Sequence, residues 1–196
     1  MTRVLSAENY QKMPWKNGQG FTLEIARSHG VGLTDFDWRV SIADVKTAGA
    51  FSHFPNRKRI IGVLDGGSGL ALHIDQKAAV TLRQKQFFAF HGESDVYAEL
   101  LDEAIRDFNL IYNPEKYAAR LHWFHTQQSP VPWISDAERV LIFNIADQLN
   151  VTVDGKSYAL NAFETLLVEN EGNSLAYIAA SLSEYDFCLI ELFSKS

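Results

Sequence analysis

The side chains with the most specific chemical potential in this sequence lie between Phe51 and Gly66. This stretch has the spacing of a metal-binding pattern of small β-barrels, in which His-any-His is followed by Glu and then by Gly. Ser52 and Phe54 stand at the two histidine positions, Arg59 at the glutamate position and Gly66 at the glycine position. A hydroxyl, a phenyl ring and a guanidinium are not ligands for a transition metal. The stretch therefore predicts a site that uses no metal.

Arg59 reverses the charge of the glutamate position, and this favours an anion-binding pocket. A guanidinium does not lose its proton in a protein, so inside a barrel it needs an anion or other polar partners. Its rigid fork of N–H groups fits a planar carboxylate in a bidentate manner. The alternative is a buried salt bridge with Glu24 or Asp107, although a buried ion pair rarely stabilises a fold more than apolar packing does.

Period-two alternation indicates which other side chains would share the inner face with Arg59. Alternation along a strand places Ser52 and Phe54 inward and turns His53 away from the site. In the run from Asp107 to Tyr112, Asp107 and Asn109 share one face, where burial would require polar partners or a ligand. The predicted polar inner surface of the first half consists of Arg39, Ser41, Ser52, Arg59, Asp107 and Asn109.

A second segment with binding potential runs from Trp15 to Ile25. Its alternation groups Gly20, Thr22 and Glu24 on one face. Gly18 and Gly20 do not complete a phosphate-binding glycine pattern, and no helix follows them. Trp15 is a candidate pocket wall, with an ordinary core position as the alternative.

The elements that position these residues are predicted to be short β-strands. Apolar and polar residues alternate clearly from Phe36 to Ala43, and a β-branched strand runs from Arg59 to Leu64. The Asp65-Gly66-Gly67 signal at its end predicts a hairpin with residues 69–74 as the partner strand, and Asp154-Gly155 predicts the turn of a second hairpin. Residues 7–13 have the pattern of a helical turn that Pro14 would stop. Further strands are predicted at 79–82, 87–90, 96–101, 107–112, 120–125, 139–145, 149–153, 157–160, 165–168, 175–180 and 186–193.

Many short strands at regular spacing, with few short helices, predict an all-β sandwich or barrel. The order strand, turn, strand recurs weakly in the two halves, and a break at residues 114–117 separates them. We therefore expect a first barrel at about residues 10–112 and a second at about 116–196, within one unit that spans residues 1–196. Because no linker rich in Pro, Gly or Ser divides the halves, the barrels are expected to share an interface. The second half offers no site and is predicted to be a scaffold.

Composition and charge exclude several classes of protein. Hydrophobic residues make up 46% and charged residues 21% of the 196 residues, values typical of a globular domain. The net charge of −6, without a basic cluster, argues against a nucleic-acid partner. No signal peptide or membrane span is visible, so the cytoplasm is the expected location. Cys188, the only cysteine, excludes an internal disulfide and is expected to be buried and inert.

At these residues the sequence resembles the HutD/Ves family of the cupin superfamily. The matching stretches are 15–18 with Thr22 and Glu24, 35–43, 49–66, 87–92 and 107–109. The resemblance implies a double-stranded β-helix (RmlC-like) bicupin without a catalytic metal or other cofactor. It also implies a link to histidine utilisation, or to a stress response for the Ves proteins, and a small carboxylate such as formylglutamate, urocanate or formate in the first barrel. Carried over by position, Arg59 is the residue expected to bind the carboxylate of the ligand. The other candidate pocket residues are Trp15, Asn17, Thr22, Glu24, Arg39, Ser41, Ser52, Phe54, Phe90, Asp107 and Asn109.

Three functional hypotheses remain open from the sequence. The first is a regulatory protein that binds a small carboxylate through Arg59. The second is a hydrolase, isomerase or deaminase that acts on an acyl or imino amino acid, with Glu24 and Asp107 as acid/base candidates and Arg59 orienting the substrate. The third is an interaction module whose barrels are filled with side chains. A homodimer is compatible with each, because edge strands of such sheets often pair across subunits.

Overall fold

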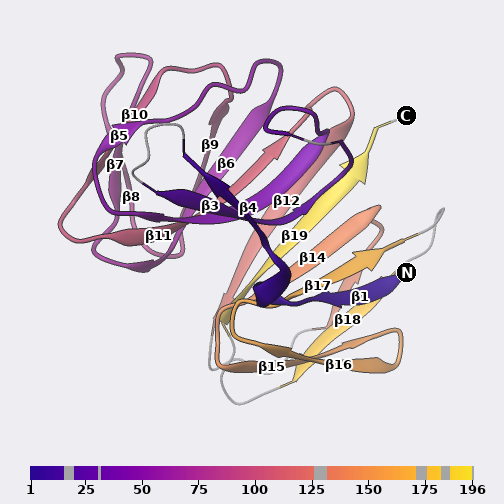
Figure 1. The fold of residues 1–196 in the computed structure, drawn as a ribbon. Helices are drawn as coiled ribbons and strands as arrows, with labels where there is room; N and C mark the ends of the chain where they lie inside the picture. Colours follow the sequence, from indigo (N-terminus) through magenta and orange to yellow (C-terminus); the bar gives the residue numbers. More distant parts are fainter. Residues whose placement is uncertain (16–19, 31, 126–131, 171–175, 182–185, 196) are drawn as a thin grey trace. The chain divides into compact units, whose positions relative to one another are not determined.

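The computed structural model describes residues 1–15, 20–30, 32–125, 132–170, 176–181 and 186–195, and these residues form an almost purely β structure (Figure 1). They divide into two compact units. The N-terminal unit is Tyr10–Glu115, and the C-terminal unit combines Met1–Asn9 with Lys116–Ser196. Within the described ranges, the single helix is the 3₁₀ turn η1 (Ala7–Asn9), and no helix has the length and apolar character of a membrane span.

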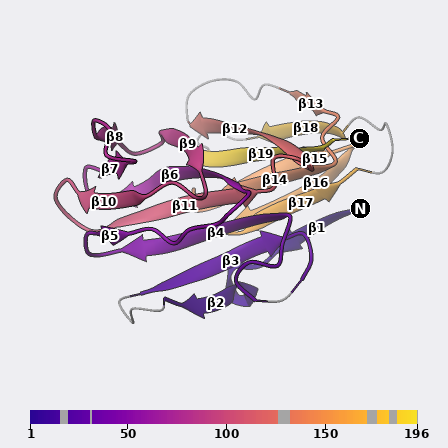
Figure 2. The ribbon, with the colours of Figure 1, turned by 90° about the horizontal axis from the view of Figure 1, so that it is seen from above.

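The N-terminal unit consists of two antiparallel sheets. The six-stranded sheet has the order β2 (Gln11–Pro14), β3 (Phe21–Arg27), β4 (Trp38–Val45), β11 (Ile105–Tyr112), β6 (Lys58–Gly66) and β9 (Phe87–His91). The four-stranded sheet has the order β5 (Gly49–Ala50), β10 (Val96–Leu100), β7 (Leu70–Ile74) and β8 (Val80–Leu82). Figure 2 shows β3, β4, β11 and β6 side by side. Polar side chains of β4, β11 and β6 can therefore lie close together in space.

The central strands β4 and β11 are buried on both faces, and their two faces differ in chemistry. One face carries fully buried apolar residues such as Val40 and Phe108. The other face carries polar residues in register across the strands, with Ser41 opposite Asn109. Towards β6 this second face becomes apolar, where Ile61 and Val63 join the core between the sheets. The polar part of the inner face is therefore confined to one side of the barrel.

Two local sequence predictions for this unit are wrong. Strand β7 does not pair with β6 but with β8 and β10 of the other sheet. The chain crosses between the sheets at residues 66–69, where Gly66 and Gly69 have φ angles of 96° and 124°, a region that favours glycine. Residues 11–14 form the edge strand β2 rather than the end of a helical turn, because they pair with β3.

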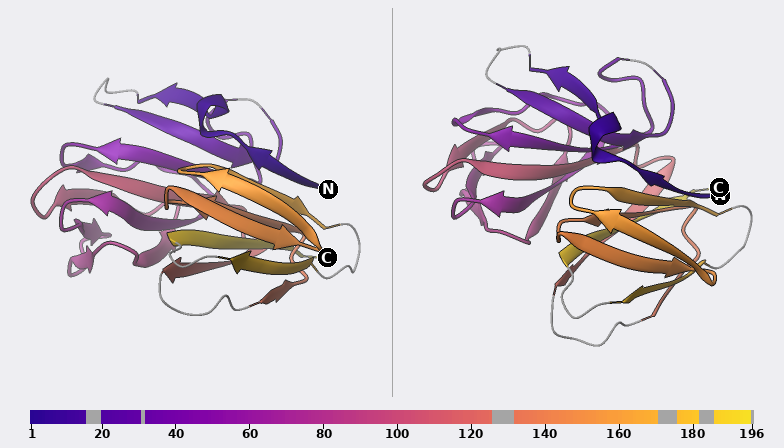
Figure 3. Two further views of the ribbon diagram at one scale, coloured as in Figure 1. Left: turned by 90° about the horizontal axis from the view of Figure 1, so that it is seen from below. Right: turned by 60° about the horizontal axis from the view of Figure 1, so that its bottom comes forward.

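The C-terminal unit also consists of two antiparallel sheets (Figure 3). The five-stranded sheet has the order β1 (Thr2–Leu5), β17 (Thr165–Glu169), β14 (Arg139–Asn144), β19 (Asp186–Ser194) and β12 (Tyr117–His125). The four-stranded sheet has the order β13 (Trp133–Ser135), β18 (Ala176–Ser181), β15 (Gln148–Val153) and β16 (Lys156–Asn161). The first strand of the chain thus belongs to the unit formed by the second half of the sequence.

Two features of this unit were expected from its sequence. Asp154 and Gly155 form the tight turn of the β15–β16 hairpin, with φ angles of 49° and 80° and Val153 opposite Lys156. Cys188 is fully buried in β19, and burial raises the pKa of its thiol well above the usual value. Both predictions are confirmed, and the thiol is unsuited to act as a nucleophile.

Candidate functional site

A cavity of about 340 Å³ opens into the barrel of the N-terminal unit. Its lining combines the polar inner face of β4, β11 and the start of β6 with the segment 47–54 and part of the β3–β4 loop. Its size is that of a site for a small organic molecule. This unit is therefore not filled by its own side chains. The lining residues are Met13, Pro14, Trp15, Thr22, Leu33, Thr34, Arg39, Ser41, Ala43, Val45, Thr47, Ala48, Gly49, Ala50, Phe51, Ser52, His53, Phe54, Arg59, Ala98, Asp107, Asn109 and Ile111.

Arg59 lies at this cavity with its guanidinium directed inward. The residue is only 8% exposed, and its Nε donates to Asn109 Oδ1 at 2.8 Å. The guanidinium carbon lies 4.2 Å from the centroid of the Phe51 ring, a distance suited to a cation–π contact. Burial lowers the pKa of Arg59 to about 10, against the attraction of Asp107, so the side chain stays charged at neutral pH. Within the described residues, no carboxylate lies within 4.0 Å of this guanidinium.

Asp107 is the acidic side chain of the cavity lining, and it is 3% exposed. Its Oδ1 atom is buried and has no hydrogen-bond partner among the described residues. Burial raises the pKa of Asp107 to about 6, although Arg59 and hydrogen bonds from Asn109 and the Ala43 backbone act in the opposite direction. The cavity thus holds a buried cation and a buried acid without a direct ion pair, which is a costly arrangement for a structural element.

A second guanidinium, that of Arg39, reaches the cavity from β4. In the sheet register Arg39 and Arg59 both stand opposite Ile111, on its two sides. The Arg39 guanidinium lies 4.8 Å from the ring of Phe36 and 5.1 Å from that of Phe54, and its Nη1 donates to the carbonyl of Leu33 at 3.2 Å. Two buried cations, on the strands that flank β11, make this side of the barrel attractive to anions.

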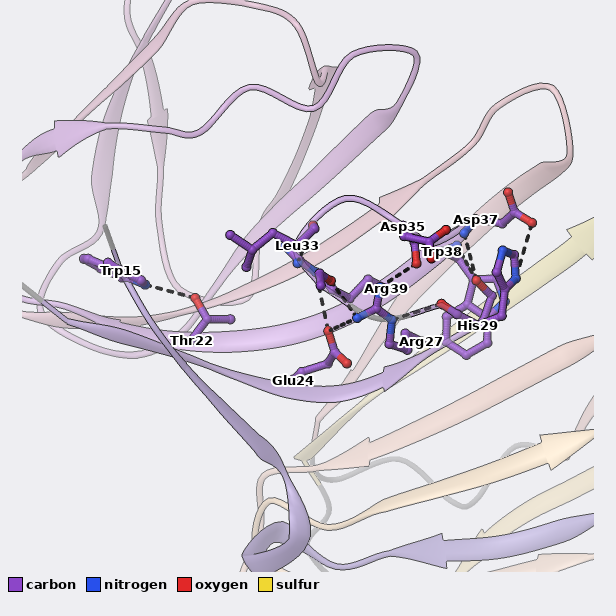
Figure 4. A network of polar contacts seen from close by, with 12 residues as sticks. Trp15, Thr22, Glu24, Arg27, His29, Leu33, Asp35, Asp37, Trp38 and Arg39 are labelled. Carbon is purple, nitrogen blue, oxygen red and sulfur yellow. Dashed lines mark hydrogen bonds and ion pairs between the residues drawn. The ribbon is translucent and has the colours of Figure 1, made fainter. Parts of the chain in front are cut away.

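The carboxylate of Glu24 balances part of this positive charge from outside the cavity (Figure 4). Its Oε2 lies 3.6 Å from Arg27 Nη1 and 4.0 Å from Arg39 Nε. Burial raises the pKa of Glu24, and the two arginines oppose that shift. Glu24 therefore acts on the cavity through Arg39 and not by contact with its contents.

Arg27 holds the β3–β4 loop, part of which forms a wall of the cavity. Its Nε, Nη1 and Nη2 donate to the backbone carbonyls of His29, Gly32 and Asp35 at 3.1, 2.9 and 2.6 Å. Figure 4 shows this guanidinium beside Glu24 and below the loop. Leu33 and Thr34 of the same loop line the cavity. The position of this wall thus depends on one side chain that does not itself line the cavity.

The structure brings most of the sequence-predicted site residues to the cavity. Trp15 and Thr22 line it together, and Trp15 Nε1 donates to Thr22 Oγ1 at 3.0 Å. Glu24 and Phe90 both lie outside the lining. The centroid of the Phe90 ring is 5.7 Å from the guanidinium carbon of Arg59. Asn17 lies outside the described residues. The predicted residues in the lining are Trp15, Thr22, Arg39, Ser41, Ser52, Phe54, Arg59, Asp107 and Asn109.

The expected alternation of residues 52–54 is wrong, because this segment is not a strand. Residues 51–57 form a loop between β5 and β6, and Ser52, His53 and Phe54 all line the cavity. His53 Nε2 lies 2.9 Å from Asp95 Oδ1. Strand periodicity applies only where a ladder of hydrogen bonds fixes it, and the loop lets three consecutive side chains reach one cavity.

Sequence reasoning missed several apolar residues of the lining, above all Phe51, Leu33 and Ile111. Ile111 belongs to the same alternating face as Asp107 and Asn109, so its position could have been predicted. Phe51 and Leu33 lie in loops, where no periodic signal marks the direction of a side chain. Their placement depends on contacts with Arg59 and Arg39, and these contacts follow no strand periodicity.

The side chains at the positions of the metal-binding pattern do not fit a metal ion. Ser52, Phe54 and Arg59 supply neither imidazole nor carboxylate donors. Across the described ranges, no group of three or more His, Cys, Asp or Glu side chains gathers in a way that could hold a metal. We therefore derive no chemistry through a metal at this cavity.

Solved structures of distant sequence define the class of fold. The chain resembles the bacterial pirin YhhW of Escherichia coli with a TM-score of 0.66 and 11% identity, over 97% of this chain and 97% of that chain. At such low identity the likeness concerns the fold alone. With its two-sheet barrel and inward-facing site, the protein is an all-β protein with a cupin-like fold.

Closer relatives define the family. The HutD family model matches residues 7–184, and the chain belongs to the HutD family. It is 42% identical, over 98% of each chain, to an uncharacterised 21.2 kDa protein in the hutC 3′ region of Pseudomonas putida. It matches the structure of HutD from Pseudomonas fluorescens with a TM-score of 0.84 and 41% identity, over 100% of both chains. Protein Ves of Escherichia fergusonii is 40% identical over 52% of this chain and 54% of its own length.

Proposed function

We propose that this protein binds a small carboxylate in the cavity of its N-terminal unit, without the help of a metal. The observation that carries the proposal is the Arg59 guanidinium, which is buried, charged and directed into the cavity, with one hydrogen bond and no ion pair among the described residues. Its two Nη groups are available for a carboxylate, which a guanidinium binds in a bidentate manner. The surrounding Ser41, Ser52 and Asn109 supply further polar contacts.

The family context suggests which carboxylate this would be. One relative lies in the hutC 3′ region of its genome, and the structure of HutD from Pseudomonas fluorescens carries the description "formate condition". We propose a ligand of the formate, urocanate or formylglutamate type, and a role in modulating histidine utilisation or a stress response in the cytoplasm. We also propose that the two units correspond to the two barrels of a bicupin.

The binding proposal is tested by titrating the protein with formate, urocanate and N-formylglutamate in a thermal-shift assay and by calorimetry. Arg59→Ala is expected to weaken binding of the best acid by at least about thirtyfold, since a charge-assisted pair in a buried site contributes roughly 2–3 kcal/mol. Arg59→Lys keeps the charge but loses the fork, so an intermediate affinity is expected. The matched control is Arg106→Ala, which removes an arginine that pairs with Asp44 outside the cavity. Undiminished affinity in Arg59→Ala would overturn the site.

A specific observation keeps an enzymatic alternative open. Asp107 lines the cavity and has a pKa raised to about 6, which suits a group that exchanges protons near neutrality. Glu24, the other acid/base candidate, does not line the cavity, so the alternative depends on Asp107 alone. Incubating the protein with N-formyl and imino amino acids, followed by NMR, tests it. Turnover that disappears in Asp107→Asn would favour an enzyme, and intact substrate after long incubation would exclude these reactions.

A further inference from the structure

The relation between Asp107 and Arg59 has a consequence for how a carboxylate enters. Both side chains are buried and line the same cavity. A carboxylate that binds to Arg59 therefore arrives close to a second carboxyl group. If both were ionised, two negative charges would share one guanidinium in a site of low polarity, which is unfavourable.

The geometry points to a site that takes up its carboxylate together with one proton, which Asp107 receives. In this step the ligand anion and a proton from solvent enter together, the Asp107 carboxylate becomes a carboxylic acid, and its new O–H donates to an oxygen of the ligand. The charge of Arg59 is then balanced by the ligand instead of by Asp107. The inference rests on the proposed function, since it requires that a carboxylate binds at Arg59.

Two features of the described residues support Asp107 as the proton acceptor. Its Oδ1 atom is buried and lacks a hydrogen-bond partner, so one oxygen is free to hold a proton and offer it to a ligand. The hydrogen bond from Asn109 and the neighbouring charge of Arg59 lower the pKa of Asp107 less than burial raises it. At the resulting pKa of about 6, protonation of the carboxylate near neutral pH costs little free energy.

The other charged groups around Asp107 are few. Arg59 approaches from β6, Arg39 from β4, and His53 from the loop before β6, and these are the other ionisable side chains of the described lining. Asp44 on β4 acts from outside the cavity and raises the pKa of Asp107. Strand β10 contributes only Ala98 to the lining.

The test uses calorimetry with formate and N-formylglutamate, whose carboxyl groups titrate below roughly pH 5 and therefore add no proton of their own at higher pH. Urocanate is unsuitable here, because its imidazole titrates in the same range. Binding is measured at about pH 7.5 in buffers of different ionisation enthalpy, which gives the number of protons taken up. We expect close to one proton per ligand, and an affinity that falls about tenfold for each pH unit above about 6.

Variants separate Asp107 from its neighbours. Asp107→Asn is expected to bind without proton uptake and with an affinity that no longer depends on pH. Glu24→Gln removes a buried carboxyl from outside the lining, and His53→Gln removes the imidazole of the described lining. Both variants are expected to retain the proton uptake. Binding that depends on Arg59 but takes up no proton in the unaltered protein would overturn this inference and leave the proposed function standing. Absence of binding by any of the acids would overturn the proposed function, and this inference with it.

Discussion

Each unit buries a charged side chain on the inner face of its larger sheet, Glu191 in the C-terminal unit and Arg59 in the N-terminal unit, and the partners of these two charges differ. Glu191 of the C-terminal unit is fully buried and accepts hydrogen bonds from Ser135 Oγ at 2.5 Å and Trp133 Nε1 at 3.2 Å. Arg120 and His122 lie 3.4 and 3.5 Å from its other oxygen. Arg59 of the N-terminal unit has one hydrogen bond and a cavity in front of it.

The difference indicates what each charge is for. A buried charge surrounded by donors and counter-charges connects strands, and its partners are already present in the protein. A buried charge that faces a cavity without an ion pair has no counter-charge in the protein. A bound ligand of opposite charge can supply that counter-charge. Burial alone does not separate the two cases, because Arg59 and Glu191 are both buried; the set of partners does.

The largest effect is expected when the structural charge is removed. Glu191→Ala leaves the donors of Ser135 and Trp133 without their acceptor and removes the counter-charge of Arg120, so we expect a loss of about 3 kcal/mol in the free energy of unfolding. Urea denaturation measures it. A loss below about 0.5 kcal/mol would contradict the structural role. Carboxylate binding in the N-terminal unit is expected to stay unchanged while the variant remains folded.

A change at Asp107 is expected to alter how stability depends on pH. Its pKa in the folded protein is about 6, above the ordinary value of 3.8, so the folded state binds the proton more tightly than the unfolded chain. The contribution of Asp107 to the free energy of unfolding is therefore fully present below about pH 3.8. It is lost, by on the order of 2–3 kcal/mol, as the pH rises from about 3.8 to about 6. Asp107→Asn should abolish this loss in denaturation curves measured across the window. Parallel curves for the variant and the unaltered protein would contradict the assignment.

A smaller effect is expected at the wall of the cavity. Arg27→Ala removes three hydrogen bonds to the carbonyls of the β3–β4 loop. With the wall loosened, we expect about tenfold weaker carboxylate binding, mainly through faster dissociation, which corresponds to roughly 1.4 kcal/mol. Stopped-flow measurements report this rate. Arg27→Lys, which keeps the charge near Glu24 but not the fork, should resemble Arg27→Ala; recovery of the slow rate would show that charge matters more than the loop.

The smallest effect compares two cation–π contacts of similar geometry. Arg59 lies 4.2 Å from the Phe51 ring in a buried site, and Arg120 lies 4.4 Å from the Phe193 ring, with an arginine side chain that is 56% exposed. Cation–π contacts contribute about 0.5–1 kcal/mol when exposed and about 2 kcal/mol when desolvated. Phe51→Leu should therefore destabilise the protein more than Phe193→Leu in urea denaturation. Equal losses would show that the surroundings of Arg59 are not as water-poor as its burial indicates.

The sequence predicted the parts of the site that strands position. Alternation placed Arg39, Ser41, Asp107 and Asn109 on one face, and Arg59 followed from its place in the spacing pattern. Prediction from the sequence failed where the chain leaves the hydrogen-bonded ladder of a sheet. Residues 51–57 form a loop, and the glycines after β6 lead to the other sheet instead of a hairpin.

The remaining errors concern side-chain contacts that strand alternation does not describe. Glu24 has the alternation of a lining residue, but the ladder between β3 and β4 shifts register after it, and its carboxylate lies beside Arg27 and Arg39. The position of Leu33 in the lining depends on a hydrogen bond from Arg39 to the backbone carbonyl of Leu33. The residue types in the sequence do not predict such a bond. Periodicity thus predicts the direction of side chains within strands, whereas the β3–β4 loop is placed by side-chain hydrogen bonds that follow no strand period.

Strand β1 has a consequence for the order in which the chain is assembled during synthesis. Thr2 pairs with Val168, so the opening strand leaves the ribosome long before its neighbour exists. The segment Tyr10–Glu115, by contrast, contains both of its sheets and has all of its internal pairings available once residue 115 has emerged. The barrel that holds Arg59 therefore has all of its strands first, whereas the other unit lacks β19, which pairs with both β12 and β14, until translation has passed residue 194.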